Sequence, residues 1–80
     1  MSARKPSRPW RLMLITPDDV ATTNHRSEPE TYRAVTAEQQ RIAEGQSDTT
    51  RITVHQWDAS ANRWRLFERI TPSRGAGTAR

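Results

Sequence analysis

Residues 50–71 read TRITVHQWDASANRWRLFERIT, and this alternating pattern predicts a β-hairpin. Polar and apolar side chains alternate with a period of two in residues 50–58 and 62–71, as they do in half-buried strands. The segment DASAN between them is rich in turn-forming residues. Pairing Trp57 with Arg63 gives a five-residue loop and keeps the apolar side chains on one face. The same register places Glu68 opposite Ile52, which indicates either a sheet edge or a bulge.

The two faces of this predicted hairpin differ in chemistry. One face is apolar and reads as a core face: Ile52, Val54, Trp64, Leu66 and Ile70. The other face combines cations with aromatic rings, and we name it the predicted binding face: Arg51, Thr53, His55, Trp57, Arg63, Arg65, Phe67 and Arg69. Of the two, only the predicted binding face suggests a function.

Upstream of the hairpin, the pattern predicts one further strand, at residues 9–16. Alternate side chains of this strand share a face, and the two sets are Trp10, Leu12 and Leu14, and Arg11, Met13 and Ile15. The tetrapeptide TPDD at 16–19 resembles a helix start, because proline is favoured at the first helical position and acids in the first turn. The polar residues at 22–24 limit it to a short turn, so residues 14–26 are predicted to be a connection.

A helix is predicted for residues 28–44. Ser27 and Glu30 have the spacing of a capping box at its start, and Gly45 suits the left-handed position just after its end. Its inward stripe is narrow: Tyr32, Val35, Gln39, Ile42 and Ala43. Glu38 is expected to face water.

These elements predict an α+β fold in the order β-α-β-β, with one helix packed on one face of a three-stranded, mainly antiparallel sheet. The last strand is expected between the other two, which makes the sheet fully antiparallel; the alternative leaves the first two strands as parallel neighbours. Residues 8–71 form the predicted domain, residues 1–7 a disordered basic arm and residues 72–80 a disordered tail.

The composition excludes several kinds of site and of membrane attachment. The chain has no cysteine, which excludes disulfides, thiolate chemistry and a zinc ribbon, and its two histidines lie far apart in the sequence. Its longest apolar run, residues 12–15, is far shorter than the roughly 20 residues that span a bilayer. We therefore predict a cytoplasmic protein with no metal, no cofactor and no membrane partner. Arginine outnumbers lysine twelve to one, a bias typical of GC-rich bacterial genomes.

The positive charge is concentrated in the terminal segments. The chain carries a formal net charge of +4, yet residues 12–71 hold seven arginines and nine carboxylates. In the N-terminal arm, Arg4, Lys5 and Arg8 alternate with prolines and read as a solvated tail that adds nonspecific phosphate contacts if the domain binds nucleic acid. Overall basicity is therefore a weak argument for a nucleic-acid partner.

An enzyme is not expected. The only adjacent carboxylates, Asp18 and Asp19, are explained by a helix start. The three glycines, at 45, 75 and 77, form no phosphate-binding loop.

Two functions fit the predicted binding face. The first is nucleic-acid binding, with arginines on phosphates and rings stacked on bases, through Arg11, Arg51, His55, Trp57, Arg63, Arg65, Phe67 and Arg69. The second is a protein interface, or self-association into a homodimer through the same face or an edge strand, because Met13, Ile15, Trp57 and Phe67 add apolar surface there. A solvated face, in which arginines shield tryptophan rings, explains the same pattern without any ligand.

Overall fold

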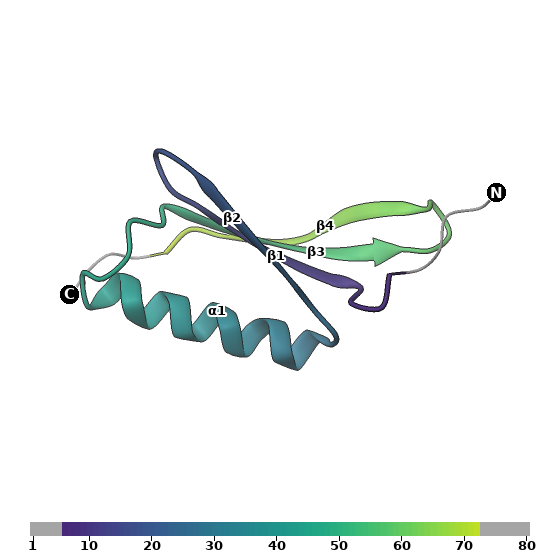
Figure 1. The fold of residues 1–80 in the computed structure, drawn as a ribbon, viewed down its shortest axis with the longest axis horizontal. Coiled ribbons are helices and arrows are strands. Elements are labelled where there is room, and N and C mark those ends of the chain that lie inside the picture. Colours follow the sequence, from purple (N-terminus) through teal and green to yellow (C-terminus); the bar gives the residue numbers. More distant parts are fainter. Residues whose placement is uncertain (1–5, 73–80) are drawn as a thin grey trace.

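A computed structural model describes residues 6–72 as one helix lying against one face of a four-stranded antiparallel sheet (Figure 1). The strands follow the order β2-β1-β3-β4 across the sheet. In chain order the elements are β1 (Trp10–Ile15), β2 (Val20–His25), α1 (Glu28–Ala43), β3 (Arg51–Asp58) and β4 (Arg63–Ile70). The α+β class is confirmed. The order β-α-β-β with three strands is wrong, because β2 precedes the helix.

The additional strand β2 lies at one edge of the sheet and was missed because it has no buried face. Its sequence, VATTNH, is exposed from Val20 to Asn24, so it lacks the alternation that marks a half-buried strand. Threonine nevertheless favours extended backbone. Hydrogen bonding to β1 supplies the remaining stabilisation, in the register Leu12 to Thr23.

The tetrapeptide at 16–19 is a β-turn and not a helix start. Thr16 Oγ1 accepts hydrogen bonds from the amides of Asp18, at 3.3 Å, and Asp19, at 2.9 Å. The Thr16 amide donates to the Asp19 carbonyl at 2.8 Å, which closes the β1–β2 hairpin. Pro17 stands at the second turn position, where its fixed φ is favoured in type I turns. The same residue types serve both structures, so the local sequence does not separate them.

Strands β1 and β3 are antiparallel neighbours, with Leu12 opposite Val54. The expectation that the last strand lies between them is wrong, and so is the parallel alternative. The extra reversal at β2 changes the direction in which the chain re-enters the sheet after the helix, so β3 pairs with β1 directly. The expectation that all strands are antiparallel is confirmed.

Ser27 caps the helix as predicted, but the Glu30 carboxylate lies beside His25 and not at the Ser27 amide, so the described residues form only half of the predicted capping box. The Ser27 hydroxyl accepts a hydrogen bond from the Glu30 amide at 3.3 Å, and the Glu30 carboxylate lies 3.4 Å from His25 Nδ1. Gly45, with φ of 75°, follows the last turn in the left-handed conformation that favours glycine.

The inward face of α1 is rotated from the predicted stripe. Its buried residues are Thr31, Val35, Glu38 and Ile42. Val35 and Ile42 were predicted correctly, whereas Gln39 and Ala43 are exposed. Glu38 is only 7 % exposed and accepts hydrogen bonds from the Ser47 hydroxyl and from Thr49 Oγ1, the latter at 2.8 Å. These hydroxyls replace the water that the carboxylate loses, which the spacing of apolar residues cannot reveal.

The β3–β4 hairpin is shifted by one residue from the predicted register. Trp57 lies opposite Trp64, and Asp58 opposite Arg63, which leaves a four-residue loop of residues 59–62. A bulge then follows: Val54 pairs with Glu68 and His55 with Leu66, so Phe67 has no partner on β3. The bulge on this edge strand therefore explains why Glu68 interrupts the predicted core face.

The core lies between the helix and the sheet. It consists of Trp10, Leu12, Val35, Ile42, Ile52 and Val54, with Leu14, Tyr32, Ala34 and Ile70 packed against it. The helix also reaches β4, because the Tyr32 hydroxyl donates a hydrogen bond to the Glu68 carboxylate. Burial and the adjacent carboxylate raise the pKa of Tyr32. The opposite face of the sheet is covered by no described element (Figure 1).

Candidate nucleic-acid interface

The face of the sheet opposite α1 is the candidate site, and we call it the open face. Residues that pair across antiparallel strands share a face, so the registers assign each side chain. The open face comprises Arg11, Met13 and Ile15 of β1; Val20, Thr22 and Asn24 of β2; Arg51, Thr53, His55 and Trp57 of β3; and Trp64, Leu66 and Arg69 of β4.

Of the eight residues predicted to contact nucleic acid, the structure brings five together on the open face and places the other three elsewhere. Arg11, Arg51, His55, Trp57 and Arg69 lie on the open face. Arg63, Arg65 and Phe67 lie on the helix side, which corrects the prediction. Phe67 packs edge-to-face on the core residue Trp10, with ring centroids 4.9 Å apart.

Two residues assigned to the core by the sequence belong to the open face. Trp64 is half-buried beside Trp57, and Leu66 is 49 % exposed opposite His55. The cause is the one-residue shift at the turn, which exchanges the faces of all β4 residues before the bulge, while the bulge restores Arg69 and Ile70 to their predicted faces. The only sequence signal for this exchange is Glu68, an acid in the predicted core.

An aromatic and cationic cluster occupies one end of the open face. The Arg11 guanidinium lies 4.1 Å from the centroid of the Trp64 ring, and Trp64 meets Trp57 edge-to-face at 5.5 Å. Arg11 Nε also donates to Asn24 Oδ1 at 3.2 Å. Stacking leaves the outer N–H groups of a guanidinium available, so this arginine is held in place and can still donate to a phosphate.

The other end of the open face holds two exposed arginines, Arg51 and Arg69. They lie on neighbouring strands at diagonal positions, which places their Cα atoms about 7–8 Å apart. The described residues contain nine arginines and nine carboxylates, yet the open face carries three of the arginines and no carboxylate. A locally positive surface therefore exists although residues 6–72 are neutral overall.

Two polar atoms between these ends have no hydrogen-bond partner among residues 6–72. Thr53 Oγ1 and His55 Nδ1 are buried and make no hydrogen bond, and Thr53 as a whole is only 8 % exposed. Burial and then the nearby Arg11 cation lower the pKa of His55, so its imidazole is neutral at neutral pH.

The position of His55 predicts a pH effect on stability. Its pKa is lowered in the folded state, so the unfolded chain takes up a proton first as the pH falls below the ordinary value of 6.5. The free energy of unfolding should therefore decrease between about pH 7 and about pH 5, and His55→Gln should reduce that decrease. Urea unfolding at both pH values measures it, with His25→Gln as the control. An equal loss in wild type and His55→Gln would contradict the assignment.

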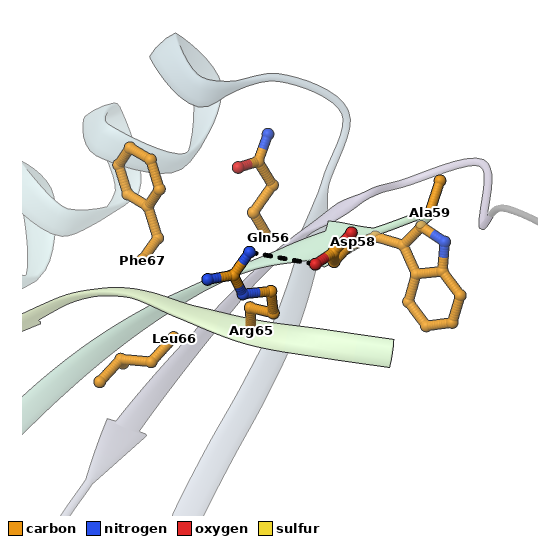
Figure 2. A pocket seen from close by; sticks show the side chains of 7 residues that line it. Gln56, Asp58, Ala59, Arg65, Leu66 and Phe67 are labelled. Carbon is orange, nitrogen blue, oxygen red and sulfur yellow. Dashed lines mark hydrogen bonds and ion pairs between the residues drawn. The ribbon is translucent and has the colours of Figure 1, made fainter. Parts of the chain in front are cut away.

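The end of the β3–β4 hairpin carries a small pocket of about 370 Å³, lined by residues of both faces of the sheet (Figure 2). Phe67 and Gln56 project to one side of the hairpin and Leu66 to the other. Asp58 Oδ1 accepts from the Ser60 hydroxyl and from the Ser60 and Ala61 amides, and Oδ2 from Arg65 at 3.1 Å. These hydrogen bonds, chiefly from Ser60 and Ala61, lower the pKa of Asp58 to about 2. Asp58 therefore organises the turn, and it partly neutralises Arg65.

The remaining predictions concern the termini, metals and membranes. Arg4 and Lys5 of the predicted arm lie outside the described residues, as does the predicted tail after Pro72, whereas Arg8 is exposed just before β1. Within residues 6–72, no group of three histidine, aspartate or glutamate side chains is placed to hold a metal ion. No helix in that part of the chain is long and apolar enough to cross a membrane.

Comparison with other proteins adds no identification. Neither a family model, a characterised protein nor a solved structure matches the chain significantly.

Proposed function

We propose that the protein is a non-enzymatic module that binds single-stranded nucleic acid on its open face. The observation that carries this proposal is the chemistry of that face, which the helix leaves uncovered. It holds three arginines, two adjoining tryptophans, a histidine and no carboxylate. Single strands are bound by cations that follow the phosphates and by rings on which bases stack. An open antiparallel sheet presents both to an extended chain.

The roles follow from the two ends of the face. Trp57 and Trp64 provide the stacking surface, and Arg11 donates to a phosphate from its position over the Trp64 ring. Arg51 and Arg69 contact phosphates about 13–20 Å away along the strands, the length of four to six residues. Thr53 and His55 lie between the two ends of the face. Sequence selectivity is therefore expected to be modest, since most of these contacts do not read bases.

A salt titration tests this proposal. The affinity for a short mixed-sequence single-stranded oligonucleotide, measured by fluorescence anisotropy, should fall between about 50 and 200 mM salt because phosphate contacts release counterions. Arg51→Gln combined with Arg69→Gln should weaken binding and reduce the slope of log K against log salt by about 1.4, or 0.7 for each lost contact. Arg33→Gln, an exposed arginine on α1, is the control and should change neither.

The competing use of this face is a protein interface. Leu66 and Val20 are 49 % and 46 % exposed there, and Met13 and Ile15 on the same face are half-buried. An apolar interface persists as salt rises, whereas phosphate binding does not. Two results together would favour a protein interface over nucleic-acid binding. The protein would bind no oligonucleotide at low salt, and it would self-associate independently of salt in a way that Leu66→Asp abolishes.

A further inference from the structure

The two edges of the sheet are built differently. Edge strand β4 carries a bulge and several charges, Arg63, Arg65, Glu68 and Arg69, which are features that discourage pairing with another chain. Edge strand β2 has none of them: VATTNH contains no charged residue, proline or glycine, its pairing with β1 is regular, and Val20 to Asn24 are exposed. The β2 edge is therefore free to accept another strand.

The hydrogen-bonding groups on this edge can be assigned. The Thr16 amide donates to the Asp19 carbonyl, and the Trp57 amide donates to the Pro9 carbonyl, each at 2.8 Å. Hydrogen-bonded pairs alternate along antiparallel strands, so Ala21, Thr23 and His25 bond β1. Thr22 and Asn24 then direct their amides and carbonyls away from the sheet. The Val20 amide also points outward, and Asp19 Oδ1 meets it at 2.8 Å.

The charges at the two ends of β2 favour a second copy of the same strand. Asp18 and Asp19 precede β2, while His25 and Arg26 end it. When two copies pair antiparallel with Thr22 opposite Thr22, Asp18 lies opposite Arg26 of the second copy and Asp19 opposite His25. The Asp18–Arg26 pair at each end is then electrostatically complementary, and opposing side chains share a face, as antiparallel pairing requires. Two β4 strands paired in the same way would bring several arginines close together.

We propose that β2 is a dimerisation edge that pairs antiparallel with β2 of a second copy around a two-fold axis at Thr22. Pairing doubles the four-stranded sheet and keeps both helices on one side. The two open faces then become one continuous surface. The Arg11–Asn24 contact lies beside the junction on both sides, so the cationic surface extends across it. This interface uses the outward backbone groups of β2, whose side chains at Val20, Thr22 and Asn24 belong to the open face.

Sedimentation velocity of the full chain over a range of concentrations, without nucleic acid, tests the pairing. Thr22→Pro removes an outward amide and leaves the bonds to β1 intact, so it should weaken dimerisation at least about tenfold while circular dichroism stays unchanged. Thr22→Lys should do the same, because it places like charges on the axis. Thr36→Lys, exposed on α1, is the matched control and should sediment as wild type.

A charge exchange tests the register. Asp18→Arg should weaken the dimer about tenfold, because it sets two arginines opposite each other at both ends of the paired strands, and adding Arg26→Asp should restore it. A wild-type chain that stays monomeric at all concentrations would overturn the proposal. So would a dimer that Thr22→Pro and Thr22→Lys leave intact, or a charge exchange that fails to restore it. None of these results bears on whether the open face binds nucleic acid.

Discussion

Trp64→Ala is expected to weaken binding of a single-stranded oligonucleotide roughly 5- to 150-fold, since stacking of one base on an aromatic side chain contributes about 1–3 kcal/mol. The substitution removes a stacking surface and also the ring that holds the Arg11 guanidinium. Trp57→Ala should produce a loss in the same range, because the two rings are in contact. Anisotropy titration at low salt measures both effects.

Phe67→Ala and Arg65→Gln are the controls for this experiment. The sequence pattern groups both residues with the binding set, but both lie on the helix side of β4, where Phe67 is 47 % exposed. They should leave the affinity unchanged at a temperature where every variant is folded. If instead Phe67→Ala and Arg65→Gln abolished binding and Trp64→Ala had no effect, the site would lie around the hairpin pocket and not on the open face.

The second large effect concerns stability and compares two leucines. Leu12→Ala should lower the free energy of unfolding by about 2–5 kcal/mol, because Leu12 is only 2 % exposed at the centre of the core. Such a loss is a large fraction of the total stability of a small domain. Leu66→Ala should cost no more than about 0.5 kcal/mol, because Leu66 lies on the open face and is 49 % exposed.

Urea unfolding monitored by circular dichroism measures both variants. The chemical change is the same in each, so the difference reports where the two side chains lie. The pairing of Val54 with Leu66, which the sequence predicts, would make Leu66 a core residue. An equally large loss for Leu66→Ala would therefore contradict the four-residue turn register of the β3–β4 hairpin and the membership of the open face that depends on it.

The elements with strong local signals could be predicted from the sequence. Strand β1 is a short, mainly apolar run that ends before Pro17, the helix has Ser27 and Gly45 at its ends, and β3 and β4 flank a turn. Strand β2 could not be predicted, because no side chain of VATTNH reports burial and because TPDD begins a helix as readily as it forms a turn. Its stabilisation comes from backbone pairing with β1, which a local pattern does not reveal.

The candidate site was predicted only in part, and the errors have one cause. The turn after Asp58 leaves a four-residue loop in place of the expected five, and a one-residue shift moves every side chain to the opposite face. Trp64 and Leu66 therefore leave the predicted core, and Arg65 leaves the predicted binding face. The bulge at Phe67 then corrects the alternation, so Arg69 was predicted on the right face. Glu38 shows a second limit, since its burial depends on hydroxyls contributed by residues after the helix.

The most direct test of the open face is to map amide chemical shifts by two-dimensional NMR while a single-stranded oligonucleotide is added at low salt. Binding on the open face predicts that the largest changes occur in β1, β3 and β4, at Arg11, Thr53, His55 and the indole N–H groups of Trp57 and Trp64. Residues on the outer side of α1, such as Arg33 and Ala37, should not shift. No change at saturating oligonucleotide, or changes confined to the helix, would contradict the proposal.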